Sequence, residues 1–116
     1  MKKKLLLLCF VCIFVLTGCA GAKYKEECLK EAKDMYSKIN DSSIVSCVVE
    51  YSEEKKGTLY EFCITEDKTL YEGVRKVAKD DKYYDTTLKA YEQILDETKN
   101  HVEGYYTYEF LAKDLK

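Results

Sequence analysis

The chain has 116 residues and a formal net charge of −2, from 19 basic and 21 acidic side chains. This length provides one small domain, and a slightly acidic chain lacks the positive surface that nucleic-acid binding requires. We therefore expect no nucleic-acid partner. Tyrosine is abundant, with 11 residues, whereas tryptophan and proline are absent.

The N-terminal segment has the three parts of a secretory signal peptide. Lys2 to Lys4 are basic, Leu5 to Leu16 form an apolar run, and the small residue Gly18 precedes Cys19. As a helix, an apolar run of 12 residues spans about 18 Å, too short for a bilayer core of about 30 Å. The pattern therefore predicts a cleaved signal peptide rather than a transmembrane helix.

The sequence Leu16-Thr17-Gly18-Cys19 resembles the lipobox of bacterial lipoproteins, at which signal peptidase II cleaves before a lipid-modified cysteine. The resemblance implies that residues 1–18 are the signal peptide, that Cys19 is lipidated, that residues 19–22 form a tether and that residues 23–116 form a single domain. The mature chain would keep 16 basic and 21 acidic residues, a formal charge of −5.

The same resemblance implies a location. The acylated cysteine would insert into membrane lipid on the outer side of the cytoplasmic membrane, or at the outer membrane if the host has one. Only Ala20 to Ala22 separate Cys19 from the first predicted helix. Three residues span at most about 10 Å, so we expect the domain to lie against the membrane.

A helix and a β-hairpin are predicted first in the mature chain. From Lys23 to Ile39, apolar residues recur at offsets of three and four, which indicates an amphipathic helix with Asn40 as a left-handed C-terminal cap. The segments Ile44 to Tyr51 and Leu59 to Thr65 are β-branched and aromatic, with Gly57 near the turn between them. They predict two paired strands.

The hairpin register follows from placing both apolar sets on one face. The first strand contributes Val45, Cys47, Val49 and Tyr51, and the second contributes Tyr60, Phe62 and Ile64. A shared face puts Tyr51 opposite Tyr60 and Cys47 opposite Ile64. We expect the helix to pack on this face through Tyr24, Cys28, Ala32, Met35 and Ile39.

Two further helices and a last strand complete the prediction. Thr69 and Glu72 resemble a capping box, which would open a helix with its apolar side chains inward, namely Leu70, Val74, Val77 and Ala78. Residues 83–99 predict another helix, because its apolar residues follow a 4-3-4 spacing at Tyr84, Leu88, Tyr91 and Leu95. After Gly104, alternation suggests a third strand, with a helix as the alternative. The fold class is therefore α+β: an N-terminal helix on a β-hairpin, then two helices and a C-terminal third strand.

Three cysteines of the mature domain remain as thiols once Cys19 carries lipid. Cys28 lies on the apolar stripe of the helix and Cys47 on the apolar face of the hairpin, whereas the expected register turns Cys63 to the other face. We therefore expect a Cys28–Cys47 disulfide, with Cys63 as a free thiol. The pairs Cys28–Cys63 and Cys47–Cys63 stay open, as do three unpaired buried thiols.

No catalytic or cofactor motif is present in the sequence. His101 is the only histidine and lies near the end of a predicted helix, where it suits the helix dipole. The cysteine spacings do not match a zinc site. We expect no enzymatic activity, no catalytic residue, no metal and no cofactor.

Surplus tyrosine favours a binding role. Tyr105, Tyr106 and Tyr108, together with Tyr83, offer more ring surface than a small core readily buries, so we expect them to form a binding patch. The leading hypothesis is a membrane-anchored, non-enzymatic lipoprotein that binds a membrane-proximal protein as an accessory, inhibitory or immunity-type module. The alternatives are a structural or surface-coat lipoprotein and a small-ligand-binding lipoprotein.

Overall fold

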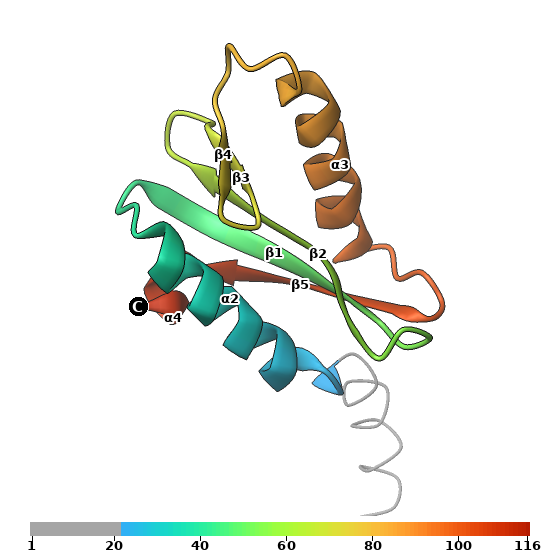
Figure 1. Cartoon of the computed structure of the whole chain (residues 1–116). Helices are drawn as coiled ribbons and strands as arrows, with labels where there is room; N and C mark the ends of the chain where they lie inside the picture. The colour runs from blue at the N-terminus through green and yellow to red at the C-terminus, as the bar shows by residue number, and fades with distance from the viewer. Residues whose placement is uncertain (1–21) are drawn as a thin grey trace, which may run out of the picture.

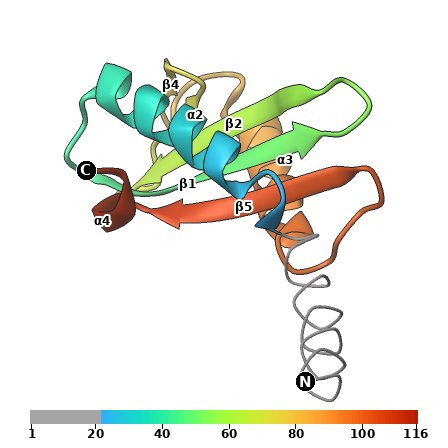
Figure 2. The same ribbon diagram turned by 90° about the horizontal axis from the view of Figure 1, so that it is seen from below.

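The computed structural model describes residues 22–116, so the lipobox and Cys19 lie outside the described residues. The described part is an α+β domain, as the sequence predicts, and its elements form three layers. A five-stranded antiparallel sheet of order β4-β3-β2-β1-β5 forms the middle layer. Helix α2 covers one face of this sheet and helix α3 covers the other (Figures 1 and 2). No helix among residues 22–116 has the length and apolar character needed to cross a bilayer.

Helix α2 spans Lys25–Ile39 and matches the predicted amphipathic segment. Cys28, Ala32 and Met35 are its buried residues, at the offsets of four and three that place side chains on one helix face. The helix ends at Asn40, whose φ of 53° is left-handed and whose N–H donates to the Tyr36 carbonyl at 3.0 Å. This is the predicted C-terminal cap.

Strands β1 (Ile44–Ser52) and β2 (Gly57–Thr65) form the predicted hairpin, but its predicted register is wrong. Cys47 lies opposite Cys63 rather than Ile64, and Tyr51 lies opposite Thr58 rather than Tyr60. A shift of one residue turns every side chain of a strand to the opposite face. The expectation failed because both faces of this sheet are covered, so that the apolar residues of the two strands need not share a face.

The two sheet faces therefore carry separate cores. Cys47, Val49 and Tyr51 pack under α2 as expected, whereas Phe62 and Ile64 join Val48 under α3. Phe62 is fully buried, and its ring meets the ring of Tyr91 edge to face at a centroid distance of 6.5 Å. Val45 was expected in the α2 core, but it lies at a register shift in β1 and is 46% exposed.

A second hairpin replaces the helix predicted after Thr69. Strands β3 (Leu70–Glu72) and β4 (Arg75–Val77) pair with each other, and β3 also pairs with β2. Gly73 in the turn between them has a φ of +59°, a conformation that glycine adopts without a steric penalty. Leu70 and Val77 are buried as expected, but from opposing strands, because a spacing of seven residues also fits a hairpin.

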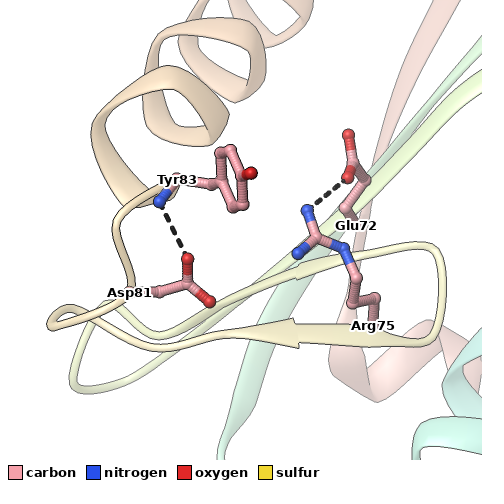
Figure 3. A network of polar contacts seen from close by, with 4 residues as sticks. All are labelled: Glu72, Arg75, Asp81 and Tyr83. Carbon is pink, nitrogen blue, oxygen red and sulfur yellow. Dashed lines mark hydrogen bonds and ion pairs between the residues drawn. The ribbon is translucent and has the colours of Figure 1, made fainter.

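Exposed polar contacts surround this second hairpin. Figure 3 shows Arg75 donating from Nη2 to Oε1 of Glu72 at 2.8 Å, across the turn. Nearby, Asp81 accepts the backbone N–H of Tyr83 at 2.8 Å, just before α3 begins. Ion pairs at exposed positions contribute little to stability, so these contacts shape the turn and the start of α3 rather than hold the fold together.

Helix α3 (Tyr84–Glu97) and strand β5 (Tyr105–Leu111) confirm the last two predicted elements. Tyr91 and Ile94 of α3 are buried against the sheet. Strand β5 pairs with β1 at the edge of the sheet opposite β4 and leads into the short helix α4 (Ala112–Leu115). Strand β5 therefore lies beside β1 of the first hairpin, next to Glu50.

Candidate functional site: a carboxyl pocket under helix α3

Glu50 is a buried acidic residue near the end of β1, between strands β2 and β5. It belongs to β1, faces the α3 side like Val48 two residues earlier, and is only 3% exposed. Its cross-strand neighbours are Tyr60 on β2 and Thr107 on β5. Burying a carboxylate costs free energy unless a partner compensates its charge. The surroundings of Glu50 therefore indicate what it can do.

A pocket of about 340 Å³ opens next to Glu50, between the C-terminal half of α3 and the sheet. Its other lining residues are Leu59, Tyr60, Gln93, Ile94, Glu97, Val102 and Tyr105. Tyr60 is 50% exposed and Val102 is 43% exposed, whereas Glu50 is almost inaccessible. The pocket therefore has an apolar, aromatic opening and an acidic interior.

A second carboxyl group, that of the half-buried Glu97, also lines the pocket. Burial raises the pKa of Glu50 to about 8, with smaller contributions in the same direction from the hydrogen bond and the negative charge of Glu97. The hydroxyl of Thr107 opposes this rise by donating to Oε2 of Glu50 at 3.4 Å. Glu97 is the last residue of α3, so the negative end of the helix dipole adds to the negative potential.

No basic side chain compensates these two carboxyl groups within the described part of the chain. The ion pairs among residues 22–116 are Lys23–Glu53, Lys38–Asp34 and Arg75–Glu72. The last turn of α3 contains no basic residue either. Glu50 is thus a buried acid that lines a pocket and has no cationic partner in its own domain.

The pocket lies at the end of the sheet where α2 begins. The start of α2, the β1–β2 turn and the start of β5 lie at the same end of the molecule (Figure 1). The carbonyl of Gly104, next to Tyr105 of the pocket, accepts the N–H of Glu53 at 2.9 Å. The carboxylate of Glu53 in turn accepts the Tyr24 hydroxyl at 3.1 Å. A short path of contacts therefore joins the pocket to the first turn of α2.

The four tyrosines expected to form one binding patch lie in three places. Tyr106 and Tyr108 are half-buried on the α2 side, as part of its core. Tyr105 faces the α3 side and lines the pocket. Tyr83 is 52% exposed beside the second hairpin, before the first residue of α3 (Figure 3). The expected patch is therefore not a single surface, although Tyr105 does belong to the candidate site.

Tyr106 belongs to an aromatic cluster at the start of α2. The ring of Tyr24 stacks on that of Tyr51, with centroids 3.9 Å apart, and meets Tyr106 edge to face at 5.0 Å. The exposed ring of His101 lies against Tyr106 at 5.3 Å. Among the described residues, no group of three or more His, Cys, Asp or Glu side chains is arranged to hold a metal ion.

The disulfide joins Cys47 to Cys63, so the expected Cys28–Cys47 pair is wrong. The two cysteines are directly opposed on β1 and β2, with Cα atoms 4.0 Å apart. The corrected register turns Cys63 toward α2, onto the same face as Cys47. Cys28, not Cys63, is the free thiol; it is completely buried, and burial raises its pKa to about 12. A buried thiol with a raised pKa is a poor nucleophile.

A second pair of acidic residues, Glu61 of β2 and Glu31 of α2, lies on the face of the sheet that α2 covers. Glu61 of β2 is half-buried and faces α2, and its Oε1 atom has no hydrogen-bond partner. Burial raises the pKa of Glu61 to about 7, and the negative charge of Glu31, a hydrogen bond with Glu31 and the negative charge of Asp34 add to this rise. The positive charge of Lys38 opposes it. Sequence reasoning overlooked both Glu50 and Glu61. The available signal was a glutamate inside each otherwise apolar strand segment, which becomes significant once both sheet faces are known to be covered.

Comparison with known proteins identified no relative of this chain. No protein-family model matches the sequence, and neither the curated proteins nor the solved structures gave a significant match.

Proposed function

We propose that this protein is a lipid-anchored, non-enzymatic lipoprotein of the cell envelope that binds a membrane-proximal partner protein. The anchor is supported by the lipobox sequence that ends at Cys19. The binding role is supported chiefly by one observation, the exposed apolar opening of the Glu50 pocket. We call this opening the pocket rim and define it as Leu59, Tyr60, Val102 and Tyr105.

The pocket rim has the character of a protein-binding surface. Aromatic side chains that surround a desolvated pocket are where interface energy concentrates, because they bury much area and lose little conformational entropy. Tyr60 and Val102 are among the largest exposed apolar side chains of the described residues. Their exposure costs free energy in the isolated domain, which a partner would recover on binding.

The position of the rim limits where the partner lies. The rim residues belong to β2, to β5 and to the loop before β5, close to the end of the molecule at which α2 begins (Figure 1). Five residues, Ala20 to Tyr24, lie between Cys19 and the first residue of α2. A segment of five residues spans at most about 17 Å. The partner surface would therefore lie within about the height of one domain from the bilayer.

The anchor is tested with the Cys19→Ala variant. Lipid attachment requires the cysteine, so this variant should accumulate as an unprocessed precursor and leave the detergent phase after phase separation. A variant that matures normally and still enters the detergent phase would contradict the anchor.

The binding role is tested by photo-crosslinking in intact cells. A photoreactive phenylalanine derivative at position 60 samples the rim, and the same group at position 33, exposed on the opposite layer, is the matched control. We expect an adduct with an envelope protein from position 60 and none from position 33. Equal adducts from both positions, or none from position 60, would contradict the proposal.

A small-ligand receptor is the second candidate, and the pocket volume favours it. Ligand pockets commonly measure about 300–1,000 Å³, and this pocket measures about 340 Å³. A free small molecule would protect the domain against heat without producing a protein adduct from position 60. That combination of results would select the second candidate over the first.

A further inference from the structure

We infer that the Glu50 pocket receives one basic side chain of the partner, a lysine ammonium or an arginine guanidinium, between the carboxyl groups of Glu50 and Glu97. This inference rests on the proposed partner-binding function and specifies the chemistry that the partner presents. It adds a defined binding site to the pocket rim.

The two carboxyl groups of the pocket lack a counter-charge among the described residues. Glu50 is 3% exposed, and none of the ion pairs among residues 22–116 includes Glu50 or Glu97. Buried carboxylates are normally paired with a cation, because an isolated buried charge is strongly destabilising. In the unbound domain a proton on Glu50 relieves the repulsion between the two groups, in agreement with the raised pKa of Glu50. A bound cation would replace this proton and release it to solvent.

Apolar and aromatic side chains line the pocket together with the two carboxyl groups. Lysine and arginine carry their charge on an apolar stem, which needs an apolar channel that leads to an acidic end. The pocket provides Ile94, Val102 and Leu59 for the stem and the rings of Tyr60 and Tyr105 beside it. Tyrosine rings also attract cations through their negative faces.

Besides a basic side chain of a partner protein, the membrane is a nearby source of ammonium groups. In a phosphatidylethanolamine headgroup the ammonium lies next to a phosphate, and the pocket lining contains no lysine, arginine or histidine to accept that phosphate. Two carboxylates and the C-terminal end of α3 would repel it. The lining thus favours a cationic side chain of a protein over a zwitterionic lipid.

The test uses the full chain in detergent micelles and three small probes that differ in charge. Nα-acetyl-lysine methylamide and Nα-acetyl-arginine methylamide carry the proposed cation, and Nα-acetyl-norleucine methylamide has the lysine stem without the ammonium. Carbon-detected NMR of the Glu50 and Glu97 carboxyl groups reports occupancy. We expect saturable shifts with both cationic probes, none with the norleucine probe, and proton release on binding below pH 8.

Variants identify the residues responsible. Glu50→Gln and Glu97→Gln keep the side-chain shape and should each weaken binding of the cationic probes at least tenfold. Glu92→Gln, on the exposed face of the same helix, is the matched control and should leave binding unchanged. If Glu50→Gln fails to fold, the wild-type titrations and the Glu97→Gln variant still decide the question.

The inference would be overturned if the norleucine probe bound as well as the cationic probes, or if both glutamine variants bound the cationic probes as tightly as the wild type. It would also be overturned if the Glu50 carboxyl signal shifted with phosphatidylethanolamine vesicles but not with phosphatidylglycerol vesicles. The last result would assign the pocket to a lipid headgroup. Failure of the proposed function is distinguishable, because cationic probes would then bind while position 60 gave no protein adduct. Conversely, an adduct that Glu50→Gln leaves unchanged would retain the partner and reject the cation.

Discussion

Thr107 donates a hydrogen bond from its hydroxyl to Oε2 of Glu50 at 3.4 Å, across the β1–β5 pair. A hydroxyl bonded to an oxygen acceptor usually lies about 2.7–2.8 Å away, so this contact is long and compensates the Glu50 charge only weakly. The ionised form of Glu50 is therefore poorly supported in the folded domain.

Stability should decrease as the pH rises from 5.5 to 8.5. In the folded state the pKa of Glu50 is about 8 and that of Glu61 about 7, both above their ordinary value of 4.5, so the folded state binds more protons than the unfolded state. The stabilising effect is complete below about pH 4.5 and is lost as the pH rises through these folded-state values. We expect the melting temperature, followed by circular dichroism, to fall by roughly 10 °C.

The groups that face each glutamate determine the controls for this measurement. Glu50 is faced by Glu97 of α3, and Glu61 by Glu31, Asp34 and Lys38 of α2. Hydrogen bonds from Thr65 and Thr69 lower the pKa of Asp67 to about 2, so that residue affects stability only below about pH 4. Glu50→Gln should flatten the pH profile, whereas Glu92→Gln should not; an identical profile in both variants would contradict the assignment.

Removing the Cys47–Cys63 disulfide should lower the free energy of unfolding of the domain. Closure of a loop of 16 residues stabilises a protein by about 3 kcal/mol. The double variant Cys47→Ala/Cys63→Ala should therefore unfold at a lower urea concentration. Cys28→Ala is the matched cysteine control, because it removes a buried atom but no cross-link.

Peptide mapping gives the corresponding direct measurement. Digestion without reductant should yield a peptide that joins Cys47 to Cys63, and Cys28 should react with an alkylating reagent only in denaturant, since its side chain is fully buried. A cross-linked peptide that contains Cys28 would contradict the register of the hairpin.

The core under α3 can be tested at its centre. Phe62→Ala should lower the free energy of unfolding by about 3 kcal/mol or more, because the ring is fully buried and contacts Tyr91. Lys55→Ala, at an exposed position of the β1–β2 turn, should change it by less than about 0.5 kcal/mol. Comparable losses in the two variants would place Phe62 outside the core.

A matched pair of tyrosines separates packing from exposure. Tyr106 is half-buried against Tyr24, whereas Tyr83 is 52% exposed. Tyr106→Ala should lower the melting temperature by several degrees, and Tyr83→Ala should leave it nearly unchanged. A larger loss of melting temperature in Tyr83→Ala than in Tyr106→Ala would indicate that Tyr106 is an exposed binding residue rather than a packed one.

Local sequence patterns predicted most elements of this fold because each of those elements has one clear period. The offsets of three and four in α2 and α3, and the alternation around Tyr106, Tyr108 and Phe110 in β5, each match the structure. The capping-box pattern of Thr69 and Glu72 predicts a helix where the structure has the β3–β4 hairpin, and the seven-residue spacing of Leu70 and Val77 suits either structure. The turn at Gly73 decides between them, and its left-handed backbone conformation is not encoded by hydrophobic spacing.

The register and the site required three-dimensional information. A strand covered on one face reveals its register by alternation, but β1 buries residues on both faces, including Val48 and Val49 in succession. The same double coverage hides Glu50, whose role depends on α3 and β5 arriving from later in the chain. The tyrosine content led to the prediction of one binding patch, because composition alone does not indicate which rings face which layer; Tyr106 and Tyr108 instead pack on the α2 side.

The placement of the disulfide has a mechanical consequence. Helix α2 leads from the proposed anchor and lies on one face of the sheet, whereas the Glu50 pocket opens on the other, so a pull between membrane and partner would pass through the sheet. Strands β1 and β2 carry residues of both cores and are joined covalently by Cys47–Cys63. That bond would stop the two central strands from sliding past each other under load, at the place where the domain would otherwise shear.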